Sequence, residues 1–170
     1  MTEVTRSSHP ELPTLVTEPL NERQMTALAQ GLAQEMKTPF VLFLEGDLGA
    51  GKTTFVRALV QALGHEGRVK SPTYGLLEHY TLRELEVLHL DLYRIGDPGE
   101  LEFLGIADLF DESSLLLVEW PERGTGALPA PDLALRIEGA MEGSGDHRRL
   151  SFYAHSCSGN ELCDSIHSLL

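Results

Sequence analysis

The segment that most constrains the fold of this chain runs from Gly46 to Thr53, with the sequence Gly-Asp-Leu-Gly-Ala-Gly-Lys-Thr. It fits the Walker A pattern Gly-x4-Gly-Lys-Thr, which forms a tight loop between a buried strand and a helix. Both neighbours are present, because Phe40–Leu44 is continuously apolar and apolar residues recur at helical spacing over Thr53–Leu63. This order predicts a loop that wraps around phosphate groups.

The predicted loop offers several contacts to a nucleotide. Glycines let the backbone approach phosphate oxygens, and the helix N-terminus supplies unpaired N–H groups with partial positive charge. We expect Lys52 to contact the β- and γ-phosphates, Thr53 to give a hydroxyl ligand to Mg²⁺, and Thr54 to reach the α-phosphate. The other expected binding residues are Gly46, Asp47, Leu48, Gly49, Ala50 and Gly51. The chain has no Asn-Lys-x-Asp segment to recognise guanine, so we expect the nucleotide to be ATP.

A magnesium site of this kind needs an acidic residue at the end of a second buried strand. Asp91 follows the mostly apolar segment Val87–Leu90, and Glu119 follows the fully apolar segment Leu115–Val118. We expect Glu119 to hold Mg²⁺ and Asp91 to orient or deprotonate the attacking water, with the reverse assignment also open. Either acid taken alone fits an ordinary strand-end carboxylate equally well.

The whole pattern predicts an α/β protein with a P-loop NTPase-like three-layer sandwich and a mostly parallel central sheet. Thr81–Glu84 is expected to turn Leu76–Tyr80 back onto Leu85–Leu92 as an antiparallel hairpin. Residues 1–10 are polar and predict a flexible tail, and residues 11–170 predict one domain without a linker. The other expected elements are a strand at Leu12–Val16, a helix capped by Asn21, a helical stretch from Pro98 to Phe110, strands at Leu133–Ile137 and Leu150–Tyr153, and a helix at Asn160–Leu170.

The composition narrows the possible partners. The chain has 26 acidic residues against 13 Lys and Arg, for a formal net charge of −13. A protein that binds nucleic acid by itself needs clustered Lys and Arg, so this charge favours either a basic protein partner or a solubility role. Cys157 and Cys163 lack zinc-site spacing and are expected to be ordinary thiols. The absence of a membrane-length apolar run or a signal peptide predicts a cytoplasmic protein.

Two segments near the predicted site have open interpretations. Ser71–Tyr74 lies between the helix and the hairpin, where its hydroxyls could sense the γ-phosphate as a switch, but a plain turn fits equally well. Trp120 directly follows Glu119, so its ring either packs in the core or gates contact with a partner.

Five ordered segments together resemble one protein family. They are GDLGAGKTT (Gly46–Thr54), KSPTY (Lys70–Tyr74), HLDLYR (His89–Arg94), EFLGIAD (Glu102–Asp108) and VEWPER (Val118–Arg123). The set resembles the bacterial TsaE (YjeE) family of P-loop ATPases over about residues 21 to 137. It is far more specific than the phosphate loop alone. The segment after Gly139 matches nothing that we can assign to the family.

The resemblance implies a Mg-dependent ATPase that is weakly active alone and assists formation of N6-threonylcarbamoyladenosine at position 37 of tRNA. It implies action with the TsaD and TsaB proteins, contact with tRNA only through that complex, and no membrane. By motif, Lys52 contacts phosphate, Thr53 and Glu119 hold Mg²⁺, and Asp91 is essential for activity. Thr26 in the N-terminal helix is the candidate contact to the base.

A P-loop small-molecule kinase is the alternative function. Such an enzyme uses the same loop to transfer the γ-phosphoryl group and normally brings an Arg-bearing lid to the transition state. Only Arg94 and Arg123 are expected near the site, so the sequence gives this alternative little support.

Overall fold

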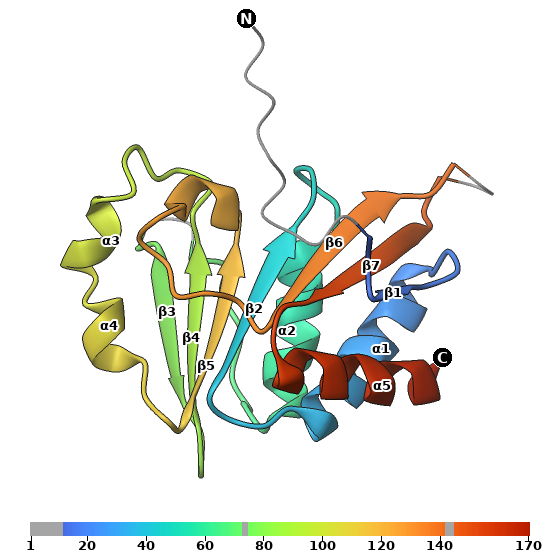
Figure 1. Cartoon of the computed structure of the whole chain (residues 1–170), viewed down its shortest axis with the longest axis horizontal. Coiled ribbons are helices and arrows are strands. Elements are labelled where there is room, and N and C mark those ends of the chain that lie inside the picture. Colours follow the sequence, from blue (N-terminus) through green and yellow to red (C-terminus); the bar gives the residue numbers. More distant parts are fainter. Residues whose placement is uncertain (1–11, 73–74, 142–144) are drawn as a thin grey trace, which may run out of the picture.

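The computed structural model describes residues 12–72, 75–141 and 145–170 (Figure 1). The predicted tail at residues 1–10 lies outside the described residues, as do Thr73 and Tyr74. The strands are β1 (Leu15–Val16), β2 (Phe40–Glu45), β3 (Leu77–Thr81), β4 (Glu86–Asp91), β5 (Ser114–Glu119), β6 (Leu133–Gly139) and β7 (Arg148–Ala154). The helices are α1 (Glu22–Glu35), α2 (Lys52–Ala62), α3 (Glu100–Phe103), α4 (Ile106–Leu109), α5 (Cys157–Leu169) and the short 3₁₀ helix η1 (Pro121–Gly124).

The strands form one sheet in the order β1-β7-β6-β2-β5-β4-β3. Its centre is parallel, because β2 pairs in parallel with β5 and β6, and β4 pairs in parallel with β5. The edges are antiparallel: β3 pairs with β4 on one side, and β7 with β6 and β1 on the other. The predicted α/β fold and the β3–β4 hairpin are confirmed. The first strand is shorter than the predicted Leu12–Val16.

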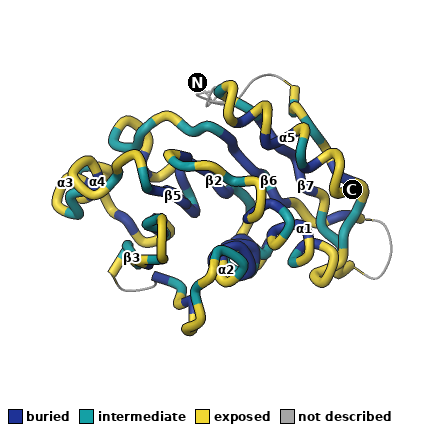
Figure 2. The backbone as a smooth tube through the Cα atoms, turned by 90° about the horizontal axis from the view of Figure 1, so that it is seen from below, coloured by how far each residue is buried: buried dark blue, intermediate teal, exposed yellow. Residues whose placement is uncertain are grey.

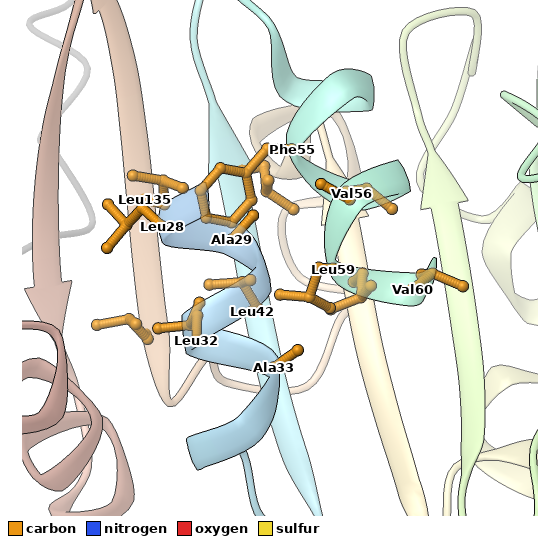
Figure 3. Close-up of a cluster of buried hydrophobic side chains, with 14 of the residues drawn as sticks. Leu28, Ala29, Leu32, Ala33, Leu42, Phe55, Val56, Leu59, Val60 and Leu135 are labelled. Atoms are coloured by element: carbon orange, nitrogen blue, oxygen red, sulfur yellow. The ribbon is translucent and has the colours of Figure 1, made fainter. Parts of the chain in front are cut away.

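Apolar side chains pack against both faces of the sheet. One core joins the sheet to α1, α2 and α5, and Figure 3 shows Leu28 of α1, Phe55 of α2 and Leu42 of β2 within this cluster. A second core lies on the opposite face, under α3 and α4, and includes Leu88, Leu90, Leu116, Val118, Leu101 and Ile106. Figure 2 shows α2 nearly end-on and largely buried, whereas α3 and α4 lie mostly exposed at one side. This packing fixes the start of α2 beside the carboxyl ends of the central strands.

Two helices differ from their predictions. The stretch from Pro98 to Phe110 forms two short helices instead of one, because Gly105 adopts a left-handed backbone with φ 65° between them. The last helix begins at Cys157 rather than Asn160, since the Ser156 side chain accepts a hydrogen bond from the Gly159 N–H and caps it.

The two cysteines are free thiols, as predicted, with Cys157 exposed and Cys163 buried. Burial raises the pKa of Cys163 to about 11. Among the described residues, no helix is both long and apolar enough to span a membrane.

Candidate nucleotide-binding site

The glycine-rich loop connects the end of β2 to the start of α2 with a backbone that requires glycine. Gly46 has φ 142°, and a Cβ atom there would collide with the backbone carbonyl of Ile137 on β6. Gly51 is the N-cap of α2 with φ 108°, and no side chain caps this helix start. The first N–H groups of α2 therefore have no partner from an N-cap side chain, which is the arrangement that phosphate-binding loops use.

Lys52 begins α2 and turns back over the loop. Its side chain is only 4% exposed, and its Nζ donates hydrogen bonds to the carbonyl oxygens of Gly46 at 2.6 Å and Asp47 at 2.9 Å. The Nζ also lies 4.3 Å from the centre of the Trp120 ring. Burial lowers the pKa of Lys52, and the negative charges of Glu119 and Asp91 partly oppose this shift. A buried ammonium group is thus held at the loop.

Thr53 and Glu119 meet directly although they lie 66 positions apart in the sequence. The Thr53 hydroxyl donates to the Glu119 carboxylate, with Oγ1 at 3.0 Å from Oε1 and 2.9 Å from Oε2. Glu119 ends β5 and is 2% exposed. The two residues predicted to hold Mg²⁺ therefore form one group of oxygen atoms.

Asp91 ends β4 and lies directly opposite Glu119 in the register of the parallel β4–β5 pair. Because side chains alternate along a strand, Asp91 shares its face with Val87, which packs in the core under α2. Desolvation raises the pKa of Asp91, while the hydrogen bond that its Oδ1 accepts from the Tyr93 N–H at 3.0 Å acts in the opposite direction. Both predicted acids are thus brought to the same edge of the sheet.

His89 is a site residue to which sequence reasoning gave no role. It is fully buried on β4, and its Nε2 lies 2.8 Å from Oε1 of Glu119. A usable signal was present, because His89 precedes Asp91 by two positions and so shares its face of the strand.

A cavity of about 450 Å³ lies between the loop and the ends of β4 and β5. This size falls in the range of small-molecule pockets. Its lining comprises Leu48, Gly49, Gly51, Lys52, Thr53, Thr54, Ser71, Pro72, Asp91, Tyr93, Arg94, Glu119 and Trp120. Gly46, Asp47 and Ala50 belong to the loop but do not line the cavity. Thr26 on α1, the predicted contact to the base, also lies outside this lining. Of the predicted switch segment, Ser71 and Pro72 reach the cavity, whereas Thr73 and Tyr74 are outside the described residues.

One wall of the cavity is aromatic. Trp120 has φ 58°, an uncommon left-handed conformation for a bulky residue, and its ring lies 5.0 Å from that of Tyr93. The Arg123 guanidinium stacks over both rings, 5.2 Å from the Tyr93 centre and 5.6 Å from the Trp120 centre. Strained residues of this kind cluster at functional sites. Trp120 thus both packs against its neighbours and lines the cavity.

The donor set fits a magnesium ion that arrives with a nucleotide better than a resident metal ion. Within the described ranges, no three His, Cys, Asp or Glu side chains gather to hold a metal by themselves. Mg²⁺ typically takes one or two protein oxygens and completes its octahedron with phosphate and water. The hydroxyl of Thr53 and the carboxylate of Glu119 are ligands of that type.

Comparison with known proteins identifies the family. The family model described as "Threonylcarbamoyl adenosine biosynthesis protein TsaE" matches residues 20–150. The chain belongs to the TsaE family. The expected resemblance is therefore confirmed, and the match extends beyond the predicted limit at residue 137 into β7.

Relatives named "tRNA threonylcarbamoyladenosine biosynthesis protein TsaE" occur in several bacteria. The Haemophilus influenzae protein is 51% identical over 98 residues, which cover 58% of this chain and 62% of that protein. The Bacillus subtilis protein is 35% identical over 147 residues, covering 86% of this chain and 90% of that protein. The crystal structure of Bacillus subtilis YdiB matches with a TM-score of 0.73 and 30% identity, over 91% of this chain and 95% of that one. A structural neighbour with a P-loop fold agrees with the fold described above.

Proposed function

We propose that this TsaE-family protein binds ATP with Mg²⁺ in the cavity beside α2 and hydrolyses it slowly when alone. We further propose that it acts with TsaD and TsaB in forming N6-threonylcarbamoyladenosine at position 37 of tRNA. The names of its relatives support the role in tRNA modification. The observation that carries the ATPase proposal is the direct contact of Thr53 with Glu119 beside the buried ammonium of Lys52.

Each residue has a separate task in this proposal. Lys52 pairs with the phosphates from the loop, and Thr53 and Glu119 supply oxygen ligands to the metal. Bound Mg²⁺ would neutralise the negative charge that develops on the transferred phosphoryl group. Asp91 orients or deprotonates the attacking water, and desolvation supports this role because a carboxyl with a raised pKa is a better proton acceptor. Thr26 stays a prediction for the base contact.

We expect weak activity from the isolated protein, although Arg94 lines the cavity, because the other arginine near the site is engaged elsewhere. Arg123 stacks on the rings of Tyr93 and Trp120, so its guanidinium is engaged with the cavity wall. Phosphoryl transfer is strongly accelerated by an arginine that reaches the transition state. We propose that a partner completes the site, and a partner with a basic surface suits a chain of net charge −13. This protein would then contact tRNA only through the complex with TsaD and TsaB.

Steady-state ATP hydrolysis tests the proposal, measured with Mg²⁺ for the protein alone and with TsaD and TsaB. We expect low activity alone, stimulation by the partners, and a loss of roughly 100-fold or more in Glu119→Ala. Glu112→Ala is the matched control, because Glu112 is an exposed acid just before the other end of β5. Normal activity in Glu119→Ala would contradict the metal assignment, and equal hydrolysis by Asp91→Asn would remove the role of Asp91. A phosphorylated acceptor in place of free phosphate would favour the kinase alternative.

A further inference from the structure

We propose that His89 is a positioning residue that fixes the Glu119 carboxylate for magnesium binding. The inference rests on the proposed function, because it concerns the same metal site. His89 is a fully buried polar side chain, and the roles given above to the phosphate loop, Asp91 and Glu119 do not account for it.

The contact belongs to a buried network across two parallel strands. In the β4–β5 register His89 lies opposite Leu117, and Glu119 is its diagonal neighbour on the same face. His89 Nε2 lies 2.8 Å from Glu119 Oε1, and the same oxygen lies 3.0 Å from the hydroxyl of Thr53. His89 is 0% and Glu119 2% exposed, so water does not compete for this hydrogen bond.

The direction of the hydrogen bond follows from the partners. An ionised carboxylate only accepts, so Nε2 of His89 must carry the proton and donate it. The other ring nitrogen, Nδ1, is buried and has no hydrogen-bond partner. A buried polar atom without a partner is unfavourable, and both neighbours of His89 on β4 are leucines. The donor function toward Glu119 explains why a histidine stands between two leucines in this strand.

The network restricts how Glu119 can turn. Oε1 accepts from both His89 and Thr53, while Oε2 accepts from Thr53 at 2.9 Å. Rotation of the carboxylate away from Thr53 would break the hydrogen bond to His89. A ligand whose orientation is fixed before the metal arrives binds it more tightly, and loss of such a supporting hydrogen bond typically costs about 10- to 100-fold in metal affinity.

The experiment compares His89→Leu, which removes the donor, with His89→Gln, whose amide keeps an N–H on a side chain of similar reach. Binding of a fluorescent ADP analogue is titrated over a range of Mg²⁺ concentrations and again in EDTA, so no catalysis is involved. We expect His89→Leu to need about 10- to 100-fold more Mg²⁺ for the same effect. Its affinity in EDTA should stay at the wild-type value, and His89→Gln should recover most of the magnesium response.

A second His–Glu pair on the same hairpin provides the control. His79 Nε2 contacts Glu86 Oε2 at 2.6 Å, but this pair is exposed to solvent and lies outside the cavity lining. His79→Leu should therefore leave the magnesium dependence unchanged. In a Glu119→Gln background, adding His89→Leu should cause no further loss, because the proposed effect passes through the carboxylate.

Several results would overturn the proposal. A wild-type magnesium dependence in His89→Leu would show that Glu119 does not need His89. Equal weakening in EDTA and in Mg²⁺ would show a general structural role instead, as would a further loss in the Glu119→Gln background. If the wild-type protein itself showed no magnesium dependence, the metal site of the proposed function would fail and this inference with it, which the wild-type titration alone reveals.

Discussion

The three long helices in the described part of the chain begin in two different ways. The side chain of Asn21 caps α1 by accepting the Gln24 N–H at 2.9 Å, and that of Ser156 caps α5 by accepting the Gly159 N–H at 3.1 Å. In contrast, the N-cap of α2 is Gly51, which has no side chain that could accept a hydrogen bond. All three helix starts need hydrogen-bond acceptors from outside the helix, because the first N–H groups of any helix have no partners within it.

The uncapped helix start lies where we propose that the nucleotide binds. A capping side chain stabilises a helix by about 1 kcal/mol relative to alanine but by only a few tenths relative to glycine, so α2 forgoes a small contribution at the edge of the cavity. The first turn of α1 also carries the acidic Glu22, which suits the helix dipole, whereas α2 has no acid in its first turn and begins with Lys52. Under the proposed function, the start of α2 is left open for an external anion, whereas side chains of the protein cap α1 and α5.

Among the variants considered, replacement of Lys52 by methionine should have the largest effect on nucleotide binding at the start of α2. The variant keeps the glycine loop and the helix but loses the charge, and truncation of one partner in a buried ion pair costs about 2–5 kcal/mol of binding. We therefore expect ADP affinity with Mg²⁺ to fall by at least roughly 30-fold in equilibrium titration. An unchanged affinity would show that the start of α2 does not bind phosphate.

The same variant has a distinctive effect on the pH dependence of stability. Because burial lowers the pKa of Lys52 below its usual 10.5, the unfolded chain holds more protons than the folded one between the lowered value and 10.5. Stability contributed by this residue must therefore rise with pH across that window. The difference in unfolding free energy, wild type minus Lys52→Met, should increase from neutral pH toward pH 10 in urea titrations. A flat difference would contradict the lowered pKa.

Replacement of Gly46 by alanine tests whether the loop depends on close backbone approach. The change places a Cβ against the Ile137 carbonyl at a φ of 142°, so strain and collision together should cost about 3 kcal/mol. Gly64→Ala is the matched control, because its φ is 111° but nothing lies within 4 Å of the new Cβ. We expect the free energy of unfolding of Gly64→Ala to fall by about 1–2 kcal/mol. Equal losses in urea unfolding would remove the role of the Ile137 contact.

The order of the elements could be predicted because the deciding signals are local. Continuous apolar runs marked β2 and β5, and the capping pattern at Asn21 marked the start of α1, where Gln24 completes a capping box. The division between α3 and α4 was missed, because the left-handed Gly105 lies inside an apolar pattern that favours one helix. Helical spacing reports which residues face the core, but it does not report where the backbone turns.

The parts of the candidate site that a sequence motif specifies could be predicted. The parts that depend on contacts between distant segments could not. Thr53 and Glu119 lie together, as two ligands of one ion must, because the position of each follows from the geometry of parallel strands and their connecting loop. Their role as magnesium ligands stays a prediction. His89 was missed because its partner lies on another strand, and a buried histidine has no local pattern of its own. The left-handed backbone of Trp120 was missed as well, because a bulky residue rarely adopts this conformation and no local sequence pattern indicates it.

The smallest effects should come from the caps that the protein makes for itself. Asn21→Ala should destabilise the protein by about 1 kcal/mol in urea unfolding, because the Gln24 N–H loses its partner. Ser156→Ala should cost somewhat more, since Ser156 Oγ also donates to Asp132 Oδ1 at 2.7 Å. Neither change should alter nucleotide affinity.

The stabilisation that a helix cap provides can be compared directly with the stabilisation that a bound nucleotide provides. A ligand at 100 times its Kd stabilises the folded protein by about 2.7 kcal/mol, which exceeds one cap. If the nucleotide acts only at the start of α2, the cap of α1 should be independent of it. The Asn21→Ala variant should then lose the same free energy of unfolding with and without Mg-ADP. A loss that depends on ligand would show that the start of α1 is coupled to the loop, and the route would be Met25, whose side chain lies where a Cβ on Gly51 would have to fit. The two kinds of helix start would then be parts of one site.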